Sequence, residues 1–251
     1  MKKIHFLNLS ILIIAGFLLS ACQIPFVNVT IIRGSGDITS ESRDVELFSE
    51  IRLEGAGQLV ITQGDTQSLE ISAEDNIIEE LTSEVIGDTL VLGYRDQSWR
   101  RTVIPTEVIR YEITVNNLTN ITLNGAGEIT MKELETDSLV VAINGAGRID
   151  IDELRGVENL EAKIIGAGTI ALAGEAENQS IAIDGAGNYR AGDLHSSTTE
   201  IEINGLGNAT VWTDESLDIS INGAGNLTYY GSPDVTQNIS GAGDIDNRGE
   251  K

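Results

Sequence analysis

The chain has 251 residues, of which 41% are hydrophobic and only 4% aromatic, and its 16 basic and 39 acidic residues give a formal net charge of −23. Nucleic acid and anionic membrane surfaces repel so acidic a chain, so we expect no nucleic-acid partner. A single cysteine excludes a disulfide framework and a CxxC metal site, and we expect no cofactor.

The first residues have the pattern of a secretory signal. Lys2 and Lys3 precede an apolar run from Leu9 to Leu19, and small residues lead to Cys22. This end resembles a bacterial lipobox, which predicts that residues 1–21 are removed, that Cys22 carries the lipid on its sulfur, and that residues 22–31 form a tether. Removal of two lysines and no acid leaves a charge of −25. The alternative is an ordinary signal peptide with an incidental cysteine.

These features predict a protein held to a bacterial membrane by the lipid on Cys22. No later apolar segment is long enough to cross a bilayer. The expected location is the cell envelope, and the surface and periplasmic sides both remain open.

A short motif, GAG or a close variant, recurs nine times after the tether. Its first glycines are Gly34, Gly55, Gly125, Gly145, Gly166, Gly185, Gly205, Gly223 and Gly241. Most steps are about 20 residues, which suits one coil of a β-solenoid better than a helical repeat. The long step from Gly55 to Gly125 marks an insertion at residues 62–118. The domain predicted from these repeats spans residues 32–251.

The insertion has its own predicted elements. Asp75 is expected to cap a short helix that runs to Leu81. Residues 84–92 predict a hairpin with Gly87 and Asp88 in its turn, and residues 109–115 alternate as a strand.

Aromatic and cationic side chains gather at the end of this hairpin. Tyr94, Trp99, Arg100 and Arg101 lie close together in the sequence, and Trp212 is a further aromatic candidate. These residues are candidates for ligand binding. Local packing or coverage of a solenoid end is the alternative.

The repeats from residue 119 onward predict strands. Apolar residues occupy every second position, as at Val141, Ile143, Ile149 and Ile151. The alternation continues through the motif, so both glycines are expected to face inward at a sharp corner while the alanine faces outward. The predicted corners are Gly125, Gly127, Gly145, Gly147, Gly166, Gly168, Gly185, Gly187, Gly205, Gly207, Gly223 and Gly225.

Two further rows follow from the same period. Asn124, Asn144, Asp184, Asn204 and Asn222 share one outward position and are expected to stack, with Ile165 and Ser240 as interruptions. Leu134, Leu154 and Leu194, with Gly174 between, mark a second corner. Nine coils at about 4.8 Å would form a rod of roughly 40 Å. The fold class is therefore all-β: a β-solenoid with glycine corners and a small helix-hairpin insertion.

The order GSG, RDVELFSEIRLEGAGQLVITQGD, LEISAEDN and GDTLVLGY, followed by NGAG repeats, resembles the head GIN domain family of auto-transporter adhesins over residues 32–245. The resemblance implies a β-solenoid in a surface or periplasmic location and supplies no catalytic residues. An auto-transporter also needs a C-terminal barrel. The chain stops at Lys251, so we expect Cys22 to be the anchor and no secretion through a barrel of its own.

The leading functional hypothesis is a binding or structural module of the envelope that adheres to a polysaccharide or protein. One alternative is a polysaccharide-active enzyme on a β-solenoid. His195, the sole histidine beyond the signal, is expected on a surface turn, and no GxSxG elbow accompanies it. Another alternative is calcium binding at acids such as Asp244 and Asp246, although the calcium-binding nonapeptide is absent. Exposed strand edges at the solenoid ends also predict end-to-end self-association.

Overall fold

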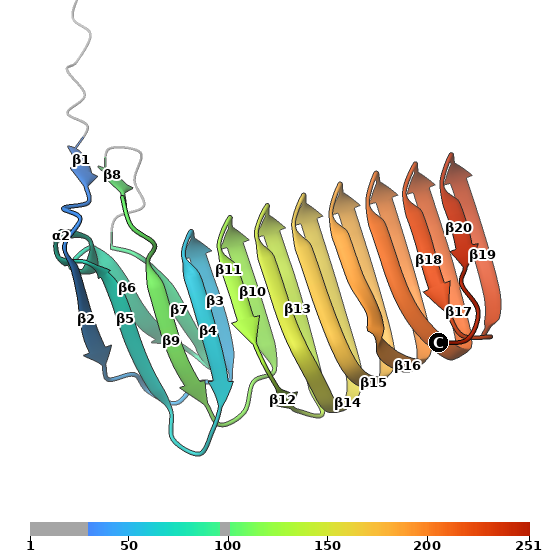
Figure 1. The fold of residues 1–251 in the computed structure, drawn as a ribbon, viewed down its shortest axis with the longest axis horizontal. Coiled ribbons are helices and arrows are strands. Elements are labelled where there is room, and N and C mark those ends of the chain that lie inside the picture. Colours follow the sequence, from blue (N-terminus) through green and yellow to red (C-terminus); the bar gives the residue numbers. More distant parts are fainter. Residues whose placement is uncertain (1–29, 96–100) are drawn as a thin grey trace, which may run out of the picture.

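The computed structural model describes residues 30–95 and 101–251 and shows an all-β solenoid (Figure 1). The N-terminal elements are β1 (Thr30–Arg33), β2 (Ile38–Arg43), β3 (Glu50–Gly55), β4 (Gln58–Gln63), β5 (Ser68–Glu74), α2 (Asp75–Ile78), β6 (Leu81–Ile86), β7 (Thr89–Tyr94), β8 (Arg101–Ile104) and β9 (Arg110–Val115). The later strands are β10 (Asn120–Gly125), β11 (Glu128–Met131), β12 (Leu134–Glu135), β13 (Ser138–Gly145), β14 (Arg148–Gly166), β15 (Thr169–Gly185), β16 (Asn188–Gly205), β17 (Asn208–Gly223), β18 (Asn226–Tyr230), β19 (Asp234–Gly241) and β20 (Asp244–Asn247).

Successive coils stack as parallel strands with the motifs in register. Gly55 pairs with Gly125, Gly125 with Gly145, and the row continues to Gly241. The amide after each glycine donates to the glycine of the preceding coil, as Ala146 does to the Gly125 carbonyl at 2.9 Å. The described residues thus contain eight stacked corners, about 34 Å from first to last at the usual strand spacing.

The core fills the inside of the coils. Ile121 pairs with Val141 and Leu123 with Ile143, and all four side chains are fully buried. The outward residues between them are partly or fully exposed, so the alternation predicted from the sequence is confirmed. Because each coil covers its neighbour's apolar row, the coils depend on stacking for their stability.

Glycine is required at the two positions of a corner for different steric reasons. The second points inward as predicted: Gly127 is buried, and a Cβ there would lie 3.0 Å from Leu53 Cδ2. The first does not. Gly145 is only half-buried, has φ +144°, and a Cβ on it would overlap the carbonyl oxygen of Gly125 in the coil below. The prediction that both glycines face inward was therefore wrong for the first one.

The earliest motif, at Gly34, is not a corner of the stack. The Gly34 amide donates to the Ile104 carbonyl at 3.0 Å, and the Gly36 amide donates to Glu74 Oε1 at 2.8 Å. The following strand, β2, runs antiparallel to β5 and joins no stacked corner. The expected nine coils are reduced to eight, because this motif instead forms a loop around a buried carboxylate.

Gly55 pairs directly with Gly125, and the residues between these two coils add a layer to the stack. Strand β7 pairs parallel with β3 and β9 pairs parallel with β4 on the N-terminal side of that coil. The hairpin of β6 and β7 is antiparallel and turns at Gly87 and Asp88, as predicted. Strand β5 pairs antiparallel with β9, and β2 pairs antiparallel with β5 as the outermost of these strands (Figure 1).

The helix in the insertion is shorter than predicted. It spans Asp75–Ile78, and Leu81 already begins β6. Asp75 is its first residue and not its cap: the N-cap is Glu74, whose side chain makes no capping bond. Arg43 accounts for the early end, because its guanidinium donates to the carbonyls of Ile78 at 3.0 Å and Leu81 at 2.9 Å.

The predicted outward ladder is present. Asn144 Nδ2 donates to Asn124 Oδ1 at 2.7 Å, and Asn204 Nδ2 donates to Asp184 Oδ1 at 3.0 Å. A second ladder, which the sequence analysis did not identify, joins Asn188, Asn208 and Asn226. The second corner is also confirmed by the pairing of Leu134 with Leu154, Leu154 with Gly174, and Gly174 with Leu194.

In the described part of the chain, no helix has the length and apolar character needed to cross a membrane.

Candidate functional site

An open groove lies across the outer face of β4, β11 and β14. Its floor comes from one outward register position on three successive coils, occupied by Val60, Thr130 and Asp150. We call it the flank groove, and it is lined by Val60, Ile61, Thr62, Gln63, Gly64, Asp65, Asn116, Thr130, Met131, Lys132, Glu133, Arg148, Asp150 and Asp152. Parallel pairing fixes the spacing of these side chains at about 4.8 Å per coil.

Several side chains of the flank groove are polar and hydrogen-bonded. Arg148 Nη2 donates to Asp150 Oδ1 at 2.6 Å, and Arg148 Nε donates to Asp150 Oδ2. The hydrogen bond to Asp150 raises the pKa of Arg148 above its ordinary value. At one rim, Gln63 exchanges two hydrogen bonds with the backbone of Glu135. The groove thus offers fixed donors and acceptors, a suitable lining for a hydroxyl-rich or amide-rich chain.

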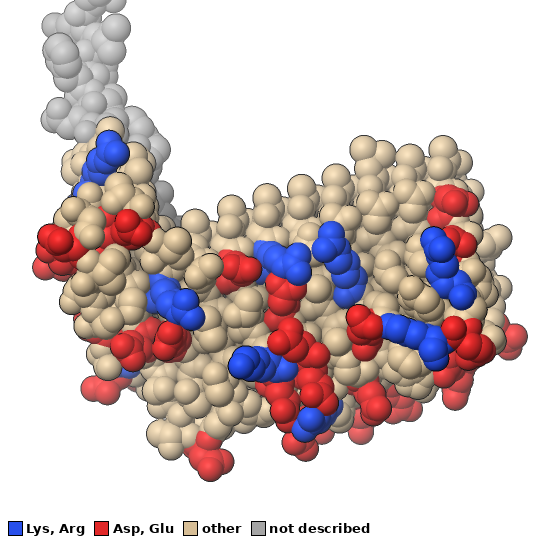
Figure 2. All heavy atoms as spheres, viewed as in Figure 1, with Lys and Arg blue, Asp and Glu red and all other residues tan. Residues whose placement is uncertain are grey.

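Charge is unevenly distributed over the face shown in Figure 2. Acidic side chains gather along the edge formed by the second corners, and arginine and lysine lie among them across the middle of the face. Arg155 shows the pattern: its guanidinium meets Glu133 of the coil below at 2.6 Å and Glu153 of its own coil at 2.8 Å. Such exposed pairs contribute little to stability, so this edge is chiefly a hydrated acidic border.

Three of the predicted aromatic and cationic candidates, Tyr94, Arg101 and Trp212, lie among the described residues, and each contacts other parts of the fold. Tyr94 packs over the first corner, where its ring lies 3.2 Å from the position of a Cβ on Gly55, and burial raises the pKa of Tyr94. Arg101 is paired with Glu80, with its Nε 3.0 Å from Oε2. Trp99 and Arg100 lie outside the described residues.

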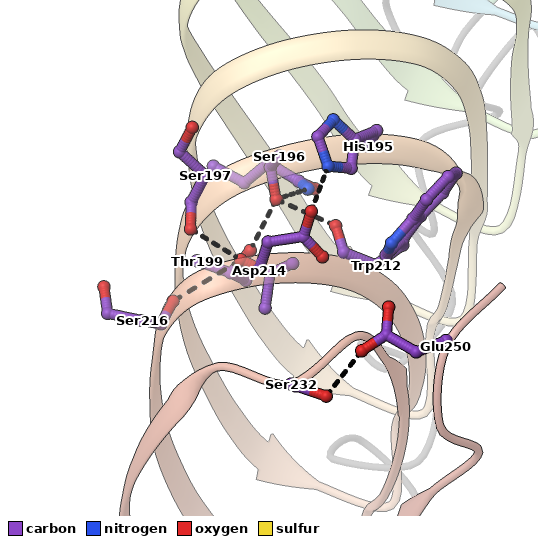
Figure 3. Close-up of polar contacts among 11 residues, drawn as sticks. His195, Ser196, Ser197, Thr199, Trp212, Asp214, Ser216, Ser232 and Glu250 are labelled. Atoms are coloured by element: carbon purple, nitrogen blue, oxygen red, sulfur yellow. Dashed lines mark hydrogen bonds and ion pairs between the residues drawn. The ribbon is translucent and has the colours of Figure 1, made fainter.

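Trp212, the remaining candidate, is part of a cluster near the C-terminal end of the rod (Figure 3). The ring of His195 meets it edge-on with centroids 4.7 Å apart. Lys251 lies over it with Nζ 5.5 Å from the ring centroid. Trp212 is therefore packed against neighbouring side chains near the end of the solenoid, which agrees with the alternative to ligand binding.

His195 has a carboxylate partner, and no hydrogen bond in the described part of the chain joins its ring to a serine hydroxyl. Its Nε2 lies 2.7 Å from Asp214 Oδ2, and the ring is partly exposed in β16 and not on a turn. Ser196 is the neighbour in sequence, yet its side chain points into the core and is buried. Strand alternation separates the two side chains, so they do not form a nucleophile and base pair.

Ser196 belongs instead to a buried polar network that the sequence analysis missed. Gln179 Nε2 donates to Ser196 Oγ at 2.7 Å, Tyr189 Oη donates to Gln179 Oε1 at 2.8 Å, and Thr199 Oγ1 lies 3.0 Å from Ser196 Oγ. Burial raises the pKa of Tyr189. The sequence signal that could have indicated this network is a polar residue, such as Gln179, at a position where the alternation places side chains inside.

The calcium hypothesis rested on Asp244 and Asp246. Both side chains face outward from β20, and Asp246 is engaged by Arg248 with Oδ2 2.8 Å from Nε. Across residues 30–95 and 101–251, no group of three or more histidine, cysteine, aspartate or glutamate side chains is placed to hold a metal ion.

The fold and the groove define a class: parallel β-solenoids with glycine corners and a polar, regularly spaced outer surface. Residues 47–233 match the family model described as "Putative auto-transporter adhesin, head GIN domain". The match covers most of the chain, and the chain belongs to this family. No curated protein shows significant similarity to it.

Solved structures share the fold. An adhesin-type protein of Bacteroides fragilis, described as "putative adhesin", is 28% identical, with a TM-score of 0.80 and coverage of 86% of this chain and 99% of that one. A "putative lipid binding protein" of Parabacteroides distasonis is 21% identical, with a TM-score of 0.73 and coverage of 87% and 99%. A "putative adhesin" of Parabacteroides merdae is also 21% identical, with a TM-score of 0.69 and the same coverage.

Proposed function

We propose that the protein is a lipid-anchored, non-enzymatic adhesion module of the cell envelope, and that it holds an extended polysaccharide or protein chain in the flank groove. The observation that carries the proposal is the groove itself. Three coils present Val60, Thr130 and Asp150 at one register position, so an extended ligand would meet side chains at a regular spacing. Membership of an adhesin head-domain family supports the same function.

The absence of catalysis is part of the proposal and is supported by local geometry. Asp150 in the groove is bound by Arg148, and His195 is bound to Asp214 on a different part of the surface. A glycosidase needs one carboxyl group free to donate a proton and a second placed across the scissile bond. The anchor at Cys22 remains a proposal from the sequence, because residues 1–29 lie outside the described part of the chain.

Binding is tested with the purified chain on an array of immobilised polysaccharides and matrix proteins. Arg148→Glu should abolish binding to whichever array member the parent chain retains, because it breaks the Arg148–Asp150 pair and adds repulsion to the groove. Arg190→Glu is the matched control, since Arg190 is exposed on the same flank but outside the groove. Equal loss in both variants, or unchanged binding by Arg148→Glu, would contradict the groove.

Fractionation of broken cells tests the anchor: the parent band should remain with the membranes, and Cys22→Ser should release it. Protease shaving of intact cells tests the location. Loss of the parent band during shaving supports adhesion outside the cell. Survival of the band until the cells are broken would refute it, because a domain inside the envelope cannot hold an external ligand.

A further inference from the structure

The C-terminal end of the rod is a bare sheet edge. All eight residues of β19 are exposed, and β19 pairs with β17 alone among the described strands. Val235 and Ile239 occupy the inward positions that Leu217 and Ile221 hold one coil earlier. Their side chains are 40% and 39% exposed, whereas Leu217 and Ile221 are fully buried. The apolar interior of the solenoid is therefore open at this end.

Beyond its first residue, Asp234, this edge lacks the features that usually prevent strands from pairing. Proteins protect exposed edges with charged residues, prolines, bulges or a covering segment. Pro233 and Asp234 stand at the start of the strand, but no charged residue and no proline occurs from Val235 to Gly243. The last described residues do not cover it either, because the Gly249 carbonyl accepts from the Gly231 amide at 3.0 Å and Lys251 Nζ reaches the Gly192 carbonyl at 2.5 Å.

The opposite end of the rod is covered by the insertion, and its outermost strand, β2, is an exposed edge that carries Glu41 and Arg43. Strand β5 crosses β9 in the antiparallel direction, β2 lies against β5, and α2 contacts both (Figure 1). Thr30, the first described residue, is also at this end. A bare end of one copy therefore finds no matching coil at the covered end of another, and head-to-tail stacking is disfavoured. Two bare ends do match, because each presents the same coil outline with the same apolar centre.

We propose that the bare edge binds a second copy of the chain, with β19 of one molecule antiparallel to β19 of the other. A two-fold contact of this kind is closed, so it yields a dimer and does not itself continue into fibres. Val235 and Ile239 of both copies become buried, and the unpaired edge amides and carbonyls gain partners. Because two acidic molecules repel one another, added salt strengthens the dimer.

The dimer would give the proposed adhesion function a partner, which is a second copy of the chain. The inference rests on the proposed function only for this biological role. In the dimer the two Thr30 ends lie at opposite ends of a doubled rod. Two copies anchored in different membranes would then join tip to tip, which is homophilic adhesion. Dimer formation itself requires neither the anchor nor a ligand in the flank groove.

The test is sedimentation of the full chain carrying Cys22→Ser, so that no lipid holds copies together. We expect a concentration-dependent dimer that strengthens with salt. Val235→Lys with Ile239→Lys should raise its dissociation constant by about tenfold or more, because like charges would meet across the two-fold contact. Ala186→Lys with Ala224→Lys is the matched control: it adds the same charge at exposed corner positions and should leave the dimer intact.

A second pair of variants separates pairing from misfolding. The double lysine variant mixed with a Val235→Glu, Ile239→Glu variant should form a heterodimer that neither forms alone. A parent chain that stays monomeric at all salt concentrations, or a dimer unaffected by the β19 lysines, would overturn the proposal. A parent chain that is monomeric but still binds an array member would refute the β19 contact and leave the groove function standing. A parent chain that is dimeric but binds no array member would refute the groove function and leave the β19 contact standing.

Discussion

The first glycine of each corner is required by its contact with the neighbouring coil as well as by its own conformation. At Gly145, φ is +144°, a region that side chains with a Cβ rarely adopt, and the missing Cβ would overlap the Gly125 carbonyl oxygen. That oxygen also accepts the Ala146 amide. Any side chain at this position would therefore force two coils apart and lengthen a hydrogen bond between them.

This geometry predicts opposite outcomes at adjacent residues. Gly145→Val should destabilise the protein by about 3 kcal/mol or more, because backbone strain adds to the overlap between coils. Ala146→Val should change stability by less than about 0.5 kcal/mol, since the alanine side chain is exposed. Urea unfolding followed by circular dichroism measures both, and equal midpoints for the two variants would contradict the corner geometry.

At the residue scale, the sequence showed where side chains point but not what they touch. Period-two alternation placed Ile143 and its neighbours inside, because alternation is a property of the strand itself. It could not distinguish the two glycines of a corner, since one is excluded by the core and the other by a backbone twenty residues away. Likewise, the contacts of Trp212 depend on Lys251, which no local pattern connects to it.

At the scale of elements, one carboxylate holds the covered end together. Glu74, at the end of β5, is 1% exposed and accepts hydrogen bonds from the amides of Gly36 at 2.8 Å and Thr106 at 2.9 Å and from the Thr106 hydroxyl. These bonds join the loop before β2 and the segment after β8 to the start of α2. The Thr106 hydroxyl lowers the pKa of Glu74 below 4.5, burial opposes this, and the amides lower it further.

The lowered pKa predicts a stability that depends on pH. A carboxyl group with a depressed pKa in the folded state stabilises the protein fully above its unfolded value and loses that effect as pH falls through the folded value. Glu74→Gln should therefore lower the melting temperature at pH 7, and the difference from the parent should shrink below about pH 4.5. Glu107→Gln, an exposed neighbour, is the control, and a difference that persists unchanged at low pH would refute the role of the charge.

Most helices and strands were predictable from the sequence, except at the covered end of the rod around Glu74. The hairpin followed from a two-residue turn between apolar strands, which is a local signal. The motif at Gly34 has the same local signal as a corner, yet it folds around Glu74, forty residues later. Which of two similar motifs joins the stack is decided by that distant acid and by Arg43, which ends α2, so the sequence alone could not reveal it.

For the molecule as a whole, stability comes from neighbours in the stack. Each coil contacts the coils on either side, and the register between them is continuous from Gly55 to Gly241. Energies of such repeats are approximately sums over neighbouring units, and a coil can be removed if the register on both sides is kept. The predicted period of about 20 residues specifies this register, whereas the bare and covered ends needed the structure to be recognised.

Deletion of residues 142–162 tests this description, because it joins Val141 to Lys163 and removes 21 residues, which equals the local period. Val141 pairs with Ala162 in the parent, so the joined strand keeps Lys163 outside and Ile164 inside. We expect a shorter rod that unfolds cooperatively at a modestly lower temperature. Deletion of residues 142–161 removes one residue fewer and shifts the alternation at the junction, which turns Lys163 into the core and Ile164 to the surface. That variant should lose its cooperative thermal transition in circular dichroism, and similar melting of the two deletions would show that the register does not control the stack.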